Sequence, residues 1–266
     1  MECCFREPVA PAFRSEGDVA ESGVQSVERA LDLLEILAEV GGDAGLSELS
    51  EQSGLPLPTI HRLMRTLVAR GYARRLPSRR YALGARMIRL GESAGRQLGA
   101  GARRHLARVA RELGETANLA MLDGEMAVYV AQAASSHSMR MFTEVGRRVH
   151  LHSTGVGKAL LGELPDAAVR DIVARAGLAP ATDRTLTDID ALLAATAEAR
   201  ERGYAVDDGE QEIGVRCFAV VVPGAPVPTA LSVSGPAARV SFEFGDRAVP
   251  VLHEVARDIG AELAGD

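Results

Sequence analysis

The chain of 266 residues has no tryptophan, three cysteines and an aromatic content of only 4%. Scarce aromatic rings argue against a surface on which single-stranded nucleic acid stacks its bases. Three cysteines, two of them adjacent at Cys3 and Cys4, cannot form a disulfide framework, which fits a reducing cytoplasm. The sequence also lacks a run of about 18 apolar residues and a secretion signal, so neither a membrane span nor export is expected.

Acidic residues are absent from one window of an otherwise acidic chain. Between Gln52 and Gly91 there is no Asp or Glu, but there are nine arginines. The formal net charge of the chain is −6, so the residues outside this window carry −15. A basic patch on an acidic molecule favours a polyanionic partner such as nucleic acid, because each neutralised phosphate releases bound counterions. The nine residues are Arg62, Arg65, Arg70, Arg74, Arg75, Arg79, Arg80, Arg86 and Arg89.

The first third of the chain has the pattern of a small helical domain with a hairpin. Apolar residues at helical spacing predict three short helices that end before Gly41, Gly54 and Gly71. Ser47 is the expected N-cap of the second helix, and two short strands joined at Pro77-Ser78 are expected after the third. The predicted organisation is a disordered tail over 1–23, a winged helix–turn–helix over 24–84, a linker helix over 85–100 and a second domain over 101–266.

The second domain mixes antiparallel strands with helices, so its expected fold class is α+β. Asp123-Gly124, between two apolar segments, is typical of a two-residue hairpin turn. A strand is also expected over 139–144. Further strands are predicted over 116–122, 126–131, 204–207, 215–222 and 229–234, and helices over 105–113, 156–161, 166–176, 188–202 and 244–263.

The arginine window fits a reader of double-stranded DNA. The apolar positions of the third helix are expected to face the core, which leaves its first turns free to enter a major groove. Arginine there can bind guanine through two hydrogen bonds, whereas arginines on the ribbon would contact phosphates. An ordinary amphipathic helix with a solvated basic face is the alternative, but it does not explain the lack of acids. The candidate DNA-binding residues are Pro58, Thr59, His61, Arg62, Arg65, Arg74, Arg75, Arg79 and Arg80.

From about Val24 onward the chain resembles the IclR family of bacterial transcriptional regulators. The segments that carry the resemblance are 26–34, 54–63, 151–161, 202–207, 214–217 and 231–236. The resemblance implies an N-terminal winged helix–turn–helix, a linker helix and a C-terminal GAF-like domain that binds a small effector. It also implies a dimer or a dimer of dimers on palindromic operator DNA. No cofactor and no enzymatic activity are expected.

The resemblance further implies an effector site in the second domain. The positions that match the family's pocket are Met141, Val149, Gly155, Val156, Asp207, Cys217, Ser232 and Ser234. The residues themselves agree with a carboxylate ligand, because serines two apart on a strand present both hydroxyls on one side. A glycine-rich turn that opens a helix also offers free N–H groups to an anion. An ordinary strand and a capped helix are the alternative.

Other functions are less well supported by the residues. Gly155-Val156-Gly157-Lys158 is not a P-loop, because His152 stands where its first glycine is required. Lys158 is instead expected near a helix end at a domain or subunit contact. His150, His152 and Cys217 could form a metal site only if the fold joined them. Cys217 lacks the placed base that a nucleophile needs.

The expected function is an effector-responsive repressor of a catabolic operon, released by a small organic acid. Segments 138–141, 144–148 and 151–155 look most like the allantoin- and glyoxylate-responsive branch of the family. A carboxylate such as glyoxylate or a ureide such as allantoate is therefore expected, with aromatic acids and glycerol-type ligands as alternatives. A transcriptional activator is the alternative to a repressor.

Overall fold

The computed structural model describes residues 23–98, 101–141 and 143–264, so the tail expected to be disordered lies almost wholly outside the described residues. The chain divides into two compact units between Glu92 and Ser93. Each unit has its own apolar core, and the boundary falls inside helix α4 (Arg86–Leu98). In the described parts of the chain, no helix is long and apolar enough to cross a membrane.

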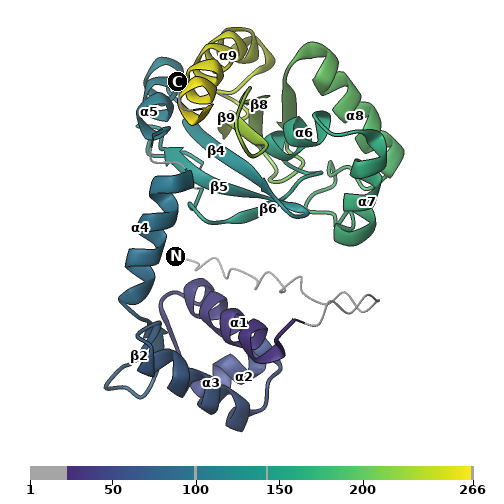
Figure 1. Cartoon of the computed structure of the whole chain (residues 1–266). Helices are drawn as coiled ribbons and strands as arrows, with labels where there is room; N and C mark the ends of the chain where they lie inside the picture. The colour runs from purple at the N-terminus through teal and green to yellow at the C-terminus, as the bar shows by residue number, and fades with distance from the viewer. Residues whose placement is uncertain (1–22, 99–100, 142, 265–266) are drawn as a thin grey trace, which may run out of the picture. The chain divides into compact units, whose positions relative to one another are not determined.

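The N-terminal unit consists of three helices and a small antiparallel sheet (Figure 1). Its core is built from the apolar faces of the helices, with Leu33, Leu37 and Ile60 fully buried. The strand order is β1–β3–β2, so the wing hairpin β2–β3 has a third strand beside it that the sequence did not predict. The elements are α1 (Gln25–Glu39), β1 (Asp43–Ala44), α2 (Leu46–Ser53), α3 (Leu57–Ala69), β2 (Ala73–Arg75) and β3 (Tyr81–Leu83).

The start of α2 differs from the prediction. Its N-cap is Gly45, not Ser47. The Glu48 carboxylate accepts a hydrogen bond of 2.7 Å from the Gly45 N–H, which satisfies a donor that a helix start would otherwise leave free. Ser47 is of a residue type that often caps helices, but it lies two residues after the observed N-cap.

The C-terminal unit is a six-stranded antiparallel sheet with helices on both faces, an α+β fold as predicted. The strand order is β6–β5–β4–β9–β8–β7. Its elements are α5 (Arg103–Leu113), β4 (Thr116–Asp123), β5 (Met126–Ala133), β6 (Arg148–His150), α6 (Gly155–Gly162), α7 (Asp166–Ala176), α8 (Ile189–Arg202), β7 (Ala205–Asp208), β8 (Val215–Val221), β9 (Thr229–Pro236) and α9 (Phe242–Ala264).

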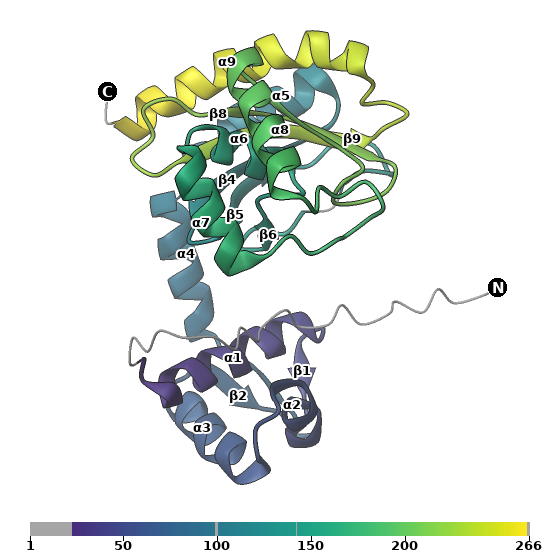
Figure 2. The same ribbon diagram turned by 90° about the vertical axis from the view of Figure 1, so that its right-hand side faces the viewer.

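The two faces of this sheet have different cores (Figures 1 and 2). Helices α5 and α9 cover one face, on which large residues such as Phe218 and Leu231 are buried. Helices α6, α7 and α8 cover the other face, where the strands present small residues such as Ala219 and Ala230. Small side chains let α6 lie close to the strands, and this places its N-terminus against the sheet.

Two local predictions for this domain need correction. The strand expected over 139–144 is wrong: residues 139–141 and 143–144 are not in a strand, and Phe142 lies outside the described residues. The partner of β5 is instead β6, where Val149 is paired with Ala127 and turns inward. The hairpin at Asp123-Gly124 is confirmed, but Asp123 still pairs with Met126, so the turn residues are Gly124 and Glu125.

Candidate DNA-binding face and effector site

Helix α3 has the two faces that its sequence predicts. Ile60, Met64 and Leu67 are buried in the core of the N-terminal unit. The opposite face carries the candidate base-reading residues, of which Pro58, His61, Arg62 and Arg65 are exposed and Thr59 is half-buried. Pro58 lies in the first turn, where its missing N–H costs no intrahelical hydrogen bond. The face that would meet a major groove is therefore cationic and not used in the core.

The four arginines of the β2–β3 ribbon are not equivalent. Arg80 pairs with Asp43 at 2.6 Å and with Glu48 at 2.8 Å, so its guanidinium ties β3 to β1 and to the start of α2. Arg74 donates from Nε to the Leu83 carbonyl across the hairpin at 3.3 Å, with its side chain exposed. Arg75 and Arg79 are exposed at the hairpin tip, where Arg79 has a left-handed φ of 65°. The tip residues are the ones free to reach a phosphate.

Charge is divided between the helices of this unit. Helix α1 carries Glu28, Asp32, Glu35 and Glu39, whereas α3 has no acidic residue. Arg86, on α4, donates from Nη1 to the Arg70 carbonyl at 3.2 Å and stacks over the Tyr72 ring, so it is engaged inside the unit. A polyanion would thus be attracted to α3 and the ribbon and repelled by α1.

In the C-terminal unit, the predicted effector residues lie on the sheet face that α6 covers. The register pairs Ser234 with Cys217, and Cys217 with Asp207, so these three side chains form a row across β9, β8 and β7. Ser232 lies two residues before Ser234 on the same face. All four are nine-tenths or more buried. The structure thus brings together residues that are far apart in the sequence.

The N-terminus of α6 lies directly over this row. A Cβ on Gly155 would lie 3.0 Å from the Cys217 Sγ, a tight contact, so glycine lets α6 approach this closely without displacing the thiol. A Cβ on Gly157 would lie 2.2 Å from the Leu151 carbonyl oxygen, so this glycine is also required by close packing. Thr154 caps the helix by accepting from the Gly157 N–H at 3.1 Å. The first N–H groups of α6, at Gly155 and Val156, belong to the helix end that binds anions.

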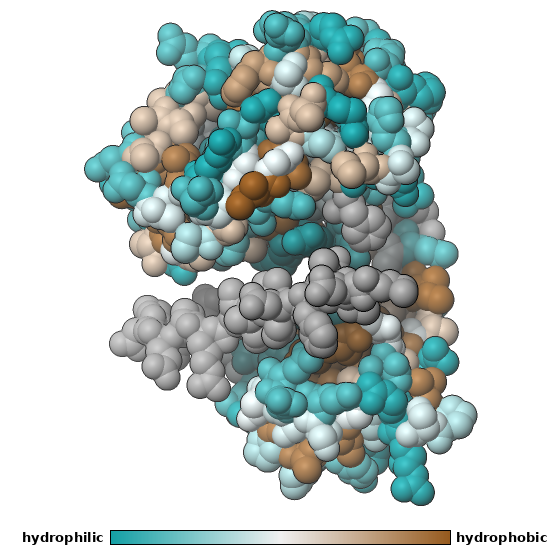
Figure 3. Space-filling model, turned by 180° about the vertical axis from the view of Figure 1, so that it is seen from behind, coloured by the Kyte–Doolittle hydropathy of each residue, from teal (hydrophilic) through white to brown (hydrophobic). Residues whose placement is uncertain are grey.

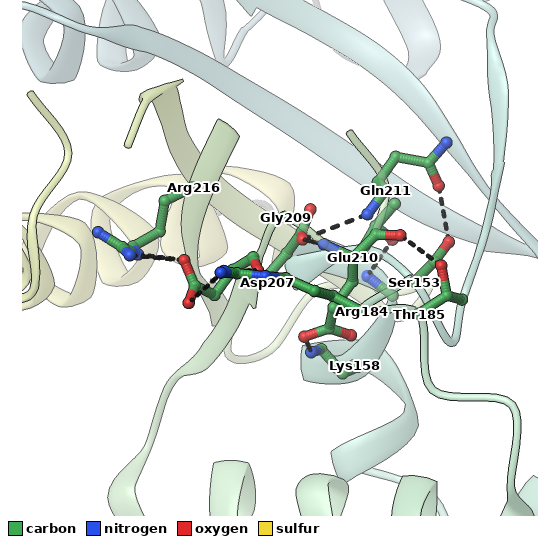
Figure 4. Close-up of polar contacts among 12 residues, drawn as sticks. Ser153, Lys158, Arg184, Thr185, Asp207, Gly209, Glu210, Gln211 and Arg216 are labelled. Atoms are coloured by element: carbon green, nitrogen blue, oxygen red, sulfur yellow. Dashed lines mark hydrogen bonds and ion pairs between the residues drawn. The ribbon is translucent and has the colours of Figure 1, made fainter. Parts of the chain in front are cut away.

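The loop after β7 closes one side of the site through a buried polar network (Figure 4). Asp207 Oδ1 accepts from the Glu210 N–H at 2.8 Å, and Lys158 on α6 forms a buried ion pair with the Glu210 carboxylate. Gln211 accepts from the Ser153 hydroxyl at 2.6 Å. Lys158, expected near a helix end at a domain or subunit contact, is instead buried in the middle of α6 and anchors this loop.

Burial changes the acid–base properties of these groups. Burial raises the pKa of Asp207 to about 7, with the Glu210 charge adding to the rise and the Glu210 N–H and Lys158 opposing it. A carboxyl that is partly protonated near neutral pH can donate a hydrogen bond to an anionic ligand. Burial also raises the pKa of the Cys217 thiol to about 12, so this cysteine stays protonated and is a poor nucleophile.

The other predicted residues occupy the edges of the site. Val149 on β6 is buried in the core beneath α6 and α7. Met141 is half-buried, and its carbonyl accepts a hydrogen bond of 3.3 Å from Thr116, whose strand position is paired with Ser234. The rings of His150 and His152 have centroids 5.3 Å apart. Over the ranges that the structure describes, no group of three metal-type side chains could hold an ion, and Cys217 does not join the two histidines.

Two polar residues at this face were missed from the sequence. Asn118 on β4 is 1% exposed and donates from Nδ2 to the Ser234 Oγ at 3.3 Å. Gln132 on β5 is paired with Asn118 in the register. The sequence shows that each of them alternates with apolar residues along its strand, but it does not show that β4 pairs with β9.

A separate cavity of about 370 Å³ lies at the other end of α6. Its walls come from α6, α8, β8 and α9 and include Arg200, His253 and Arg257. None of the predicted effector residues lines it. Arg200 is occupied there as a helix cap, because it donates to the Gly162 carbonyl at 2.5 Å and to the Leu164 carbonyl at 3.0 Å.

A helix–turn–helix unit whose third helix carries exposed arginines, followed by an α+β unit with a buried polar face, is typical of DNA-binding transcriptional regulators. Two family models match the chain: the IclR helix-turn-helix domain over residues 26–77 and the bacterial transcriptional regulator IclR C-terminal domain over residues 94–261.

Known proteins resemble the chain over most of its length. It is 36% identical to the transcriptional repressor IclR of Escherichia coli over 256 residues, covering 91% of this chain and 92% of the repressor. It is 32% identical to the Escherichia coli repressor AllR over 250 residues, covering 92% of each. The crystal structure of an IclR regulator from Alicyclobacillus acidocaldarius matches with a TM-score of 0.81 at 30% identity, covering 91% of this chain and all of that one.

A more distant structure shares the fold. It is an IclR homologue from Microbacterium hydrocarbonoxydans in complex with 4-hydroxybenzoate, with a TM-score of 0.79 at 23% identity, covering 91% of this chain and all of that one. The chain belongs to the IclR family of bacterial transcriptional regulators. It is a DNA-binding regulator and not an enzyme.

Proposed function

We propose that the protein is a repressor of a catabolic operon that leaves its operator when a small organic acid binds the C-terminal domain. The observation that carries the proposal is the row Ser234–Cys217–Asp207 beneath the N-terminus of α6, because it combines hydroxyls, free helix N–H groups and a carboxyl with a raised pKa. The described relatives IclR and AllR are both named as repressors, which favours repression over activation. Operator DNA in the cytoplasm is the expected target.

DNA recognition is assigned to α3 and the wing. Arg62 and Arg65 on the exposed face of α3 would read base edges, with Pro58, Thr59 and His61 beside them. Arg75 and Arg79 at the hairpin tip and Arg74 beside it would contact phosphates. Arg80 would act mainly by holding the wing to α2, because Asp43 and Glu48 already occupy its guanidinium.

The effector is expected to bind through its carboxylate. The acid would lie over β9, with its carboxylate near the Gly155 and Val156 N–H groups and the hydroxyls of Ser232 and Ser234. Asp207 in its protonated form would donate a further hydrogen bond, and Met141 and Val149 would form the apolar wall. Glyoxylate or a ureide such as allantoate fits the similarity to AllR, and the 4-hydroxybenzoate complex of a relative keeps aromatic acids as the second candidate.

Self-association is part of the proposal, because palindromic operators require two copies. Val27 and Leu31 on α1 are each 54% exposed, and Val24 at the start of that helix is 65% exposed. On α4, Ile88 is 65% exposed and Leu90 is 48% exposed. Hydrophobic residues also reach the surface of the N-terminal unit in the view of Figure 3. These apolar positions are suited to a contact with a second copy.

The test is an electrophoretic mobility shift with operator DNA selected from a random library, with and without candidate acids. The full-length protein should bind the selected duplex, and at least one small carboxylate should release it. A protein that binds no duplex, or that holds its duplex unchanged with every acid, would contradict the proposal.

A further inference from the structure

The sheet face under α6 contains polar atoms that nothing in the described protein satisfies. Asn118 Oδ1, Ser232 Oγ and Gln132 Nε2 are each buried without a hydrogen-bond partner among the described residues. Buried polar groups in folded proteins almost always have partners, since an unpaired one has lost its water and gained nothing. Three such atoms on one face therefore point to a group that is absent from the protein itself.

The register places these three residues side by side. Asn118 is paired with Gln132 on one flanking strand and with Ser232 on the other, so they form one row across β5, β4 and β9. Alternation puts them on the α6 side, because Ala117 and Leu119 on either side of Asn118 belong to the opposite core. Ser232 is shared with the candidate carboxylate site, so this row continues that site toward β5.

Only one of the two polar atoms in the Asn118 amide has a hydrogen-bond partner within the residues that the structure describes. Its Nδ2 donates to the Ser234 Oγ at 3.3 Å, which leaves Oδ1 as the unpaired atom. If the two ends of the amide are exchanged, the serine donates to Oδ1 and the free atom becomes a donor. In either orientation one buried amide atom of Asn118 is available beside Gln132, so the row can both accept and donate a hydrogen bond.

We propose that the effector site extends from Ser232 to Asn118 and Gln132, and that the effector is therefore a small carboxylate with a second hydrogen-bonding group, such as a hydroxyl. The proposal rests on the acid-binding function proposed above. A hydroxyl matches the row because it donates to one amide and accepts from the other. An acid whose remainder is only hydrocarbon would leave these amide atoms buried and unpaired. A site with such atoms discriminates strongly against a ligand that cannot pair them.

Matched acids test this proposal on the full-length protein. Isothermal titration calorimetry would compare glycolate with acetate, lactate with propionate and 4-hydroxybenzoate with benzoate. For at least one pair, the hydroxy acid should bind about tenfold more tightly or better than its parent. Asn118→Leu has nearly the same size but no amide, so this preference should fall below about threefold.

Two further variants complete the test. Gln132 is only half-buried, so Gln132→Leu should fold even if Asn118→Leu does not, and it should also reduce the preference. Thr196→Val is the control, because this buried hydroxyl donates to the Leu193 carbonyl within α8 and faces no ligand in the proposal. The Thr196→Val variant should prefer each hydroxy acid over its parent acid as strongly as the unaltered protein does.

Three outcomes decide between the proposals. Equal binding within every pair, or a preference that survives in both Asn118→Leu and Gln132→Leu, would overturn the extended site and leave the acid-binding function intact. If the unaltered protein binds none of these acids and neither glyoxylate nor allantoate, the acid-binding function itself is refuted, and the extended site with it. A preference that both variants lose and Thr196→Val keeps would support the extended site.

Discussion

Replacing Arg62 with alanine tests how the protein reads DNA. Arg62 is exposed in the first turns of α3, and its side chain makes no hydrogen bond or ion pair with the described residues, so replacing that side chain should not affect the fold. If its guanidinium forms a two-bond contact with guanine, the loss is about 1–3 kcal/mol, which raises the operator Kd roughly 5- to 150-fold. The preference for one base pair should weaken as well.

Two arginines of the wing provide the comparison. Arg79→Ala should weaken binding to every duplex similarly and lower the slope of log Kd against log salt by about 0.9 for each bound copy, as expected for one lost phosphate contact per copy. Arg80→Ala should lower the melting temperature of the N-terminal unit, because Asp43 and Glu48 lose their partner. Its salt slope should stay close to that of the unaltered protein.

Fluorescence anisotropy with a labelled operator at several salt concentrations measures all three variants. Circular dichroism would confirm that each is folded. Unchanged operator affinity for Arg62→Ala at fixed salt would refute the assignment of α3 as the recognition helix. A fall in salt slope for Arg80→Ala as large as that for Arg79→Ala would refute the distinction between the two arginines.

Three other changes test the C-terminal domain. Between about pH 4 and 7 folded Asp207 holds a proton that the unfolded chain releases, so the stability that this group contributes should fall by roughly 4 kcal/mol as pH rises through this window. Asp207→Asn should flatten that dependence in urea unfolding at a series of pH values, and an unchanged slope would contradict it. Ser234→Leu fills the site, so operator binding should persist while acids no longer release the DNA; normal release would place the site elsewhere. Gly157→Ala puts a methyl group 2.2 Å from the Leu151 carbonyl oxygen, so α6 must shift and the free energy of unfolding in urea should fall by about 1–3 kcal/mol.

Local patterns in the sequence predicted the elements that bury one face. The spacing of Ile60, Met64 and Leu67 identified α3 and its free side, and Ser232 and Ser234 at alternate positions identified one face of β9. Strand β1 was not predictable, because two residues have no periodicity and their pairing with Tyr81 and Ala82 alone makes them a strand. The strand predicted over 139–144 was wrong for a related reason, because no local pattern showed which residues pair with β5.

The candidate site was also predicted only in part, because local sequence patterns do not show which strands pair. Its residues on β7, β8 and β9 came from the family resemblance, and the structure places Asp207, Cys217 and Ser234 in one row. Asn118 was missed because only the pairing of β4 with β9 places it beside Ser232, and the two residues are more than a hundred positions apart. The burial of Lys158 with Glu210 likewise depends on how the loop after β7 folds over α6.

In the proposed mechanism, an acid bound in the C-terminal domain changes the affinity of the N-terminal domain for DNA. The most direct measurement is the operator Kd of the full-length protein and of Ser234→Leu, each with and without an acid that binds the unaltered protein. We expect the acid to weaken operator binding by the unaltered protein and to leave operator binding by Ser234→Leu unchanged. Equal operator Kd values with and without the bound acid in the unaltered protein would contradict it.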